Sequence, residues 1–230
     1  LLKEVFLSMI GVDPADDQSF ELRSKESKPS RKRIILCVNR SLGEMELLQT
    51  KLRSFLAQLK LNGFEIIFID LPEVSFDYKT ISSTDIRADI TKFLHRYGSD
   101  NEPRSFEGLV ECYRERPHAH LYGMERLEDA LAMPQIEKSE LKKLVQENVV
   151  KARNLINSIL DRYDADFVGF LNFVDWFSIG GGPSSTLPVS FETKPPISIM
   201  LGSRVGNDLA LLDIVQEFSE VAKAAQHTDN

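Results

Sequence analysis

The sequence has only two cysteines and no long apolar run. Cys37 lies inside the apolar segment Ile34 to Val38, where a small core residue fits better than half of a disulfide. No apolar run approaches the roughly 20 residues that a membrane-spanning helix needs, and no basic segment precedes an apolar one at the N-terminus. We therefore expect reduced thiols, no membrane span and a cytoplasmic location.

Positive charge is also scarce, because 28 Lys and Arg face 35 Asp and Glu and leave a net charge of −7. The one basic run, Lys25 to Arg33, contains no aromatic residues, which argues against nucleic acid as a partner. The turn Asn39 to Gly43 has a single glycine and not the glycine-rich pattern of nucleotide sites. His118 and His120 have no obvious third ligand nearby and fit a surface loop. We therefore expect no cofactor and no metal.

Apolar strands and amphipathic helices do alternate along the chain. Arg33 to Val38 is apolar after its first residue, Glu44 to Leu61 carries a helical apolar stripe, and Phe64 to Leu71 is apolar again. Such a strand, helix and strand unit pairs its strands in parallel. Further helices are predicted at 1–10, 83–97, 105–113, 137–163 and 207–225, a strand at 166–173 and a polar loop at 19–32. The predicted fold class is α/β, with a mixed β-sheet flanked by helices on both faces.

The segment from Gly180 to Gly206 differs from the rest in its glycines and prolines. Glycine and proline both disfavour helix, so an irregular run across the sheet is predicted, followed by a strand from Ile197. No G-x-S-x-G pattern surrounds Ser184 and Ser185, which fit turn residues better than nucleophiles.

The same segment resembles the C-terminal signature of the amidase signature family. The resemblance rests on Gly182-Pro183-Ser184-Ser185-Thr186-Leu187-Pro188, on Phe191, and on Pro196-Ile197-Ser198-Ile199-Met200-Leu201 with Arg204 beyond. Two more stretches are similar to motifs of that family, namely Gly11-Val12-Asp13-Pro14-Ala15-Asp16 and Tyr122-Gly123-Met124-Glu125. The resemblance implies that residues 1–230 are the C-terminal portion of one amidase-signature domain, without its N-terminal catalytic part.

Members of this family are hydrolases that cleave carboxamides with a serine, a cis-serine and a lysine. In the family these groups precede the turn that is matched at Gly11, so the resemblance gives this chain no catalytic residue and implies that the chain alone is inactive. It does imply a wall facing a small-molecule amide substrate, formed by Trp176, Phe177, Ile179, Gly181, Ser184 and Thr186.

Two other functions are alternatives to this one. A non-catalytic interaction or regulatory module derived from an amidase would share all these features. The glutamine-hydrolysing subunit of a tRNA-dependent amidotransferase carries a tyrosine- and serine-rich segment that residues 121–148 lack, so no tRNA amidation is expected. Without an N-terminal part, an apolar patch around Val5, Met9, Trp176, Phe177 and Leu187 should stay exposed and favour self-association of the isolated chain.

Overall fold

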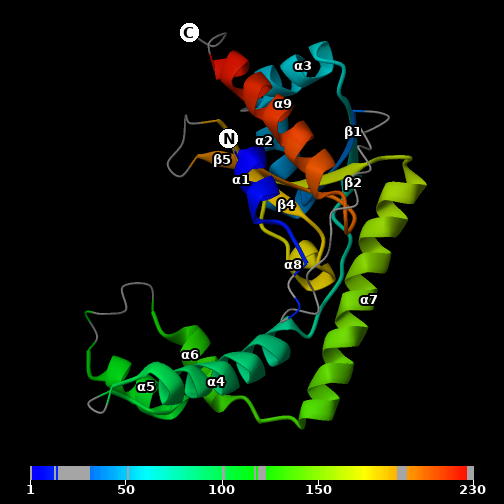
Figure 1. Ribbon diagram of the computed structural model, residues 1–230. Helices are drawn as coiled ribbons and strands as arrows, with labels where there is room; N and C mark the ends of the chain where they lie inside the picture. Colours follow the sequence, from blue (N-terminus) through cyan, green and yellow to red (C-terminus); the bar gives the residue numbers. More distant parts are fainter. Residues whose placement is uncertain are drawn as a thin grey trace. The chain divides into compact units, whose positions relative to one another are not determined.

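The chain folds into two compact units, which Figure 1 shows as a computed structural model. The structure describes residues 2–12, 14, 32–50, 52–99, 102–116, 118, 123–190 and 196–226. The first unit comprises Leu1–Glu73 and Val149–Asn230 and holds the sheet; the second, Val74–Asn148, is helical. Most of the predicted loop at 19–32, and parts of the motifs around residues 11–16 and 117–125, lie outside the described residues.

The sheet of the first unit is mixed, as the sequence predicts. Its strand order is β2-β1-β3-β5-β4, with β1 parallel to β2 and β3, and with β5 antiparallel to β3 and β4. The parallel pairing predicted for β1 and β2 is confirmed. The strands are β1 Arg33–Val38, β2 Glu65–Asp70, β3 Phe167–Phe170, β4 Ser184–Ser190 and β5 Ile197–Gly202.

One face of the sheet is covered by α3 (Arg53–Leu61) and α9 (Asp208–Gln226). Side chains alternate along a strand, so Ile34, Leu36 and Val38 all enter the core beneath these two helices. The Phe218 ring joins the helices, because its centroid lies 5.0 Å from that of Phe55 and 5.9 Å from that of Phe64. This is the larger of the hydrophobic cores.

The opposite face carries α8 (Trp176–Gly180), and the last turns of α7 (Lys138–Arg162) bury Ala152, Ile156, Ile159 and Leu160. Phe170 of β3 makes edge contacts with Trp176 and Phe177, at centroid distances of 4.9 and 6.0 Å. Figure 1 shows α8 on the other side of the sheet from α9. Helices therefore lie on both faces, and the predicted fold class is confirmed.

The first unit also contains α2 (Glu44–Thr50), which was predicted to be continuous with α3, and α1 (Leu2–Met9), which lies against α9. The helix predicted at 44–61 is divided into α2 and α3, because Leu52 leaves helical geometry while its side chain is fully buried. α1 contacts α9, and its Lys3 Nζ lies 2.6 Å from Asp213 Oδ1. Within the described part of the chain, no helix is both long and apolar enough to cross a bilayer.

The run predicted to be irregular contains a regular strand, β4, at the edge of the sheet. Pro188 is opposite Ser198, and a register shift follows before Ser190. An edge strand tolerates proline, because the missing N–H can face away from its only neighbour. β2 forms the other edge of the sheet and is only half-buried, although its sequence is apolar like that of β1.

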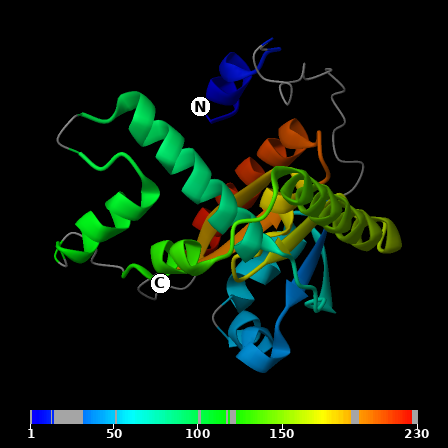
Figure 2. The ribbon, with the colours of Figure 1, turned by 90° about the horizontal axis from the view of Figure 1, so that it is seen from below.

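The second unit packs three helices, α4 (Tyr78–Tyr97), α5 (Phe106–Arg114) and α6 (Glu125–Ala132), which Figure 2 shows from a second side. Its core contains Phe106, Val110 and Ala130, with Ile90 of α4 against them. The sequence pattern missed α6 and began α4 five residues late. The side chains of Ile86 and Phe93 on α4 are 39% and 60% exposed. Their exposure means that part of the apolar surface of α4 lies outside this core.

Candidate functional site

The predicted substrate wall lies where α8 turns into β4. Gly181 ends α8 in the left-handed conformation, with φ of 71°, which favours glycine over any residue with a Cβ. Its N–H and that of Gly182 both donate to the Phe177 carbonyl, the second over 3.0 Å. The chain leaves this turn directly into β4, which positions Ser184 and Thr186 beside α8.

Two further glycines are required by close packing. A Cβ on Gly202 would lie 2.2 Å from the Phe177 ring, so that ring rests on the bare backbone of β5. A Cβ on Gly182 would lie 2.8 Å from the Ser203 carbonyl oxygen. Since real Cβ atoms do not approach so closely, the turn and the end of β5 can meet only through glycines.

Ser203, directly after β5, is fully buried and hydrogen-bonds to three neighbouring segments. Its N–H donates to the Pro183 carbonyl over 3.1 Å, and its hydroxyl donates to the Asp166 carbonyl over 2.7 Å. The Asn207 side chain donates to the same hydroxyl over 3.0 Å, just before α9 begins. The backbone and side chain of one residue, Ser203, therefore join the turn to the start of β3, the end of β5 and the start of α9.

A cleft of about 240 Å³ opens beside the turn. Within it Arg153 Nε donates to the Gly180 carbonyl over 2.6 Å, and the Arg204 guanidinium pairs with Asp161 over 2.7 Å. Guanidinium groups donate to carbonyl and carboxylate oxygens, so the cleft can hold a polar group that accepts hydrogen bonds. Its lining is Arg153, Ile156, Asn157, Gly180, Gly182, Ser203, Arg204 and Val205.

The six predicted wall residues are brought onto one stretch of the sheet surface, but none of them lines this cleft. Trp176 and Phe177 are buried, whereas Ser184 and Thr186 are exposed. Residues directly opposite each other on paired strands lie on the same face of the sheet. Ser184 is opposite Gly202, and the Phe177 ring of α8 covers Gly202. Thr186 is opposite Met200, two residues along β5. Ser184 and Thr186 thus lie on the α8 face of the sheet. Ile179 is half-buried and Gly181 exposed.

Sequence reasoning missed Arg153, which reaches Gly180 from α7. A single arginine on a long helix rich in Lys and Arg carries no signal of its own, so only the packing of α7 against the turn distinguishes it. Arg204 and Gly182 were part of the motif that carries the resemblance.

The predicted apolar patch is not present as one surface. Trp176, Phe177 and Leu187 are 4%, 0% and 7% exposed, whereas Val5 and Met9 are 46% and 79% exposed. Leu187 belongs to the core under α9, while Trp176 and Phe177 lie on the other face of the sheet. The prediction was wrong for these three residues, because the chain's own strands and helices cover them. The exposed part is limited to α1.

The carboxyl ends of β1 and β3 carry a second buried polar group. The Glu44 carboxylate accepts from the Asn39 backbone N–H over 2.6 Å and from the Asn172 side chain. Burial raises the pKa of the nearby Cys37 thiol to about 12, and the Glu44 charge adds to the rise. Cys37 is therefore a protonated core residue, and both cysteines are free. The residues that the structure describes contain no cluster of His, Cys, Asp and Glu suited to a metal ion.

Comparison with known proteins gives a clear result for structures only. No family model and no curated protein matches the sequence. The structure is similar to an amidase family protein from Bacillus anthracis str. Ames, with a TM-score of 0.71, 17% identity, and coverage of 95% of this chain and 46% of that one. It is also similar to the native peptide amidase from Stenotrophomonas maltophilia, with a TM-score of 0.64, 14% identity, and coverage of 83% and 43%.

A third structure, fatty acid amide hydrolase, matches with a TM-score of 0.52, 12% identity, and coverage of 83% of this chain and 39% of that one. The chain therefore spans less than half the length of these matched chains. At such identities the similarity establishes a common fold. The resemblance to amidases seen in the motifs is confirmed at the level of the fold.

Proposed function

We propose that the protein is an amidase-type hydrolase of a small carboxamide and that this chain forms the substrate-facing part of its domain. The observation that carries the proposal is the match of 95% of the chain to an amidase fold. The domain assignment belongs to the proposal: residues 1–230 are taken as the C-terminal portion of a single amidase-signature domain.

The α8 face of the sheet supports this role. Ser184 and Thr186 present hydroxyl groups beside the buried aromatic pair of α8. Trp176 and Phe177 are buried and support this face from within, and ligand sites commonly carry a few polar groups that orient the ligand. Because Ser203, Gly181 and Gly202 hold the turn rigidly, Thr186 would present its side chain to a substrate in one position.

In the proposed reaction the nucleophile comes from a serine outside this chain. That serine attacks the amide carbon, a lysine and a cis-serine relay its proton to the leaving amine, and backbone N–H groups stabilise the oxyanion. The chain's own part is to bind and orient the substrate. Residues 1–230 alone should therefore hydrolyse no amide.

The test compares residues 1–230 with the product of the complete gene. Both proteins are assayed against aryl and fatty amides and treated with a fluorophosphonate that labels active serines. We expect turnover and labelling only in the complete product, at a serine outside residues 1–230. Turnover by residues 1–230 that disappears on Ser184→Ala or Ser185→Ala would contradict the proposal, and a complete product without turnover or labelling would favour the interaction module.

The wall is tested with a matched pair of substitutions in the complete product. Thr186→Trp fills the α8 face and should raise KM for bulky amides about tenfold or more, because lost apolar contacts and steric overlap weaken binding. Gln216→Trp adds the same side chain at an exposed position of α9 and should change nothing. Equal effects of the two would remove Thr186 from the wall.

A further inference from the structure

The cleft beside the turn from α8 to β4 is rich in hydrogen-bond donors, and its described lining includes no Asp or Glu. Arg153, Ile156 and Asn157 reach it from α7, at the spacings of three and four residues that place side chains on one face of a helix. Arg204 and Val205 reach it from the segment between β5 and α9. Polar side chains from two distant segments of the first unit therefore line one cleft.

Arg153 uses only part of its guanidinium within the fold. Its Nε donates to the Gly180 carbonyl over 2.6 Å, and its Nη2 lies 3.4 Å from the place of a Cβ on Gly181. The guanidinium is thus held beside the glycines of the turn. Among the residues that the structure describes, Arg153 has no ion pair and no second side-chain hydrogen bond. Since a guanidinium has five N–H donors, its two Nη groups can donate to a ligand.

Arg204 and Asn157 also have donors to offer. The Arg204 guanidinium pairs with Asp161 through Nη2, over 2.7 Å, and the Asp161 side chain is 70% exposed and outside the lining. The Asn157 side chain is half-buried and makes no hydrogen bond within the described part of the chain. Two guanidinium groups and a single neutralising carboxylate leave the cleft positively charged.

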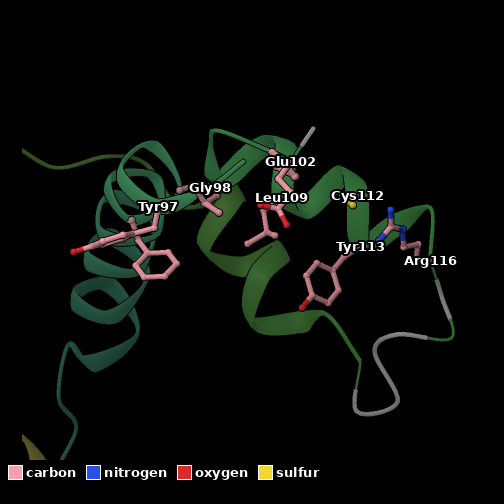
Figure 3. Close-up of a pocket in the computed structure, with 10 residues that line it drawn as sticks. Tyr97, Gly98, Glu102, Leu109, Cys112, Tyr113 and Arg116 are labelled. Atoms are coloured by element: carbon pink, nitrogen blue, oxygen red, sulfur yellow. The ribbon is translucent and has the colours of Figure 1, made fainter. Parts of the chain in front are cut away.

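A larger pocket in the second unit lacks this imbalance of charge. It lies between α4 and α5 and has a volume of about 460 Å³. Figure 3 shows Glu102 and Arg116 among its lining residues, which are one acidic and one basic side chain. In the cleft of the first unit, both charged lining residues are arginines. Of these two cavities, only the cleft has an excess of positive charge.

We propose that the cleft binds a small oxyanion, the phosphate or carboxylate group of a ligand, through Arg153 and Arg204. Guanidinium groups donate pairs of N–H bonds to both kinds of group, and the Asn157 carboxamide adds a further donor. The volume of about 240 Å³ is below the roughly 300 to 1,000 Å³ of sites that hold whole drug-sized molecules, so it suits an ion or the charged end of a ligand.

Such an anion would link α7 to the segment before α9, next to the turn that carries the proposed substrate wall. The proposal does not rest on the hydrolase function, because it uses only the donors of the cleft. Its test therefore needs no catalytic activity.

Calorimetry of residues 1–230 at constant ionic strength measures the binding. Phosphate and acetate are titrated separately, in a buffer without other oxyanions, and sodium chloride is the reference titrant. We expect saturable binding of at least one of the two oxyanions at millimolar concentration. Tighter binding of phosphate assigns the cleft to a phosphate group, and tighter binding of acetate assigns it to a carboxylate group.

Substitution of the arginines tests which donors hold the anion. Arg153→Gln and Arg204→Gln should each weaken binding of the preferred anion about tenfold or more, because a hydrogen bond from a charged group is lost. Arg53→Gln makes the same change at an exposed position of α3, outside the cleft, and should have no effect. Circular dichroism checks that each variant keeps its helices.

A second pair of substitutions leaves the bond between Arg153 and Gly180 in place. Asn157→Asp puts a carboxylate into the cleft at almost unchanged size and should also weaken anion binding about tenfold or more, through repulsion and competition for the arginines. Gln216→Glu adds a carboxylate at an exposed position of α9, outside the lining, and is the control. If an arginine variant loses helical signal, this pair decides.

The proposal is overturned if neither phosphate nor acetate binds saturably at millimolar concentration. It is equally overturned if Asn157→Asp binds the anion as tightly as the unchanged chain, or if the controls weaken binding as much as the substitutions in the cleft. Saturable binding that Asn157→Asp and the folded arginine variants weaken, and that the controls leave unchanged, supports it.

Discussion

Two glycines, Gly182 and Gly202, allow the close packing around α8. The Phe177 ring occupies the space where a Cβ of residue 202 would be, and the Ser203 carbonyl does the same at residue 182. These contacts position the turn from α8 to β4, and with it the proposed substrate wall. The glycines of this segment are therefore a consequence of close approach between α8, β4 and β5.

Replacing Gly202 by alanine should lower the free energy of unfolding by about 1 to 3 kcal/mol, the usual cost of overpacking a core. The reason is the Phe177 ring, which lies 2.2 Å from the position of the new Cβ and is itself buried. Urea denaturation followed by tryptophan fluorescence measures the change, because Trp176 lies next to Phe177. Gly11→Ala is the control, since a Cβ there meets nothing within 4 Å. Equal stability of the two variants would show that Phe177 can move at no cost.

At the scale of elements, the start of α4 is held by one polar side chain. Asn148 is 3% exposed; its Oδ1 accepts from the Asp77 N–H over 2.9 Å and its Nδ2 donates to the Leu144 carbonyl over 2.8 Å. Asp77 is the residue before α4, and Asn148 lies on α7. The pair thus fastens α4 to α7 within the second unit.

We expect Asn148→Ala to destabilise the second unit by about 1 to 3 kcal/mol, because a partly buried backbone N–H loses its partner. Hydrogen exchange should become faster in the first turns of α4 and stay unchanged in β1 and β3. Asn154→Ala, at an exposed position of the same helix, is the matched control. An exchange rate in α4 that does not change, or that changes equally in both variants, would mean that other contacts hold this helix.

For the whole molecule, two surfaces of the first unit bear on self-association, namely α1 and the outer part of the α8 face. Val5, Leu7 and Met9 of α1 are 46%, 47% and 79% exposed, and Ser184 and Thr186 leave β4 uncovered on the α8 face. In the proposed hydrolase these surfaces pack against the part that carries the nucleophile. Self-association of the isolated chain stays a prediction, and its basis is now α1.

Sedimentation velocity of residues 1–230 at micromolar concentration should show species heavier than one chain. The double substitution Leu7→Lys with Met9→Lys should shift them toward the monomer, because burying unpaired lysines in a contact is costly. Substituting two exposed residues of another helix, α7, by Lys142→Gln and Lys151→Gln also changes the net charge by two units and should leave the association unchanged. A wild-type chain that is monomeric throughout would contradict the prediction.

The sequence by itself determined the local order of the fold and its family resemblance. The apolar runs at Ile34 to Val38 and Ile197 to Leu201, and the helical stripes of α5, α7 and α9, are strong periodic signals that need no distant partner. The motif at Gly182 to Pro188 pointed to amidases, whose fold the structure shares. The burial of Cys37 was also predicted, because its neighbours on both sides are apolar.

Only the tertiary structure decided which surfaces meet. β4 is a regular strand because it pairs with β5, which provides hydrogen-bond partners for the backbone of β4 despite Pro188. Leu52 is fully buried at the break between α2 and α3, whereas Phe93 of α4 is 60% exposed, although both are apolar positions of predicted helices. The approach of Arg153 to Gly180 likewise joins residues of two different elements. Periodicity records which side of an element is apolar, but it carries no information on what packs there.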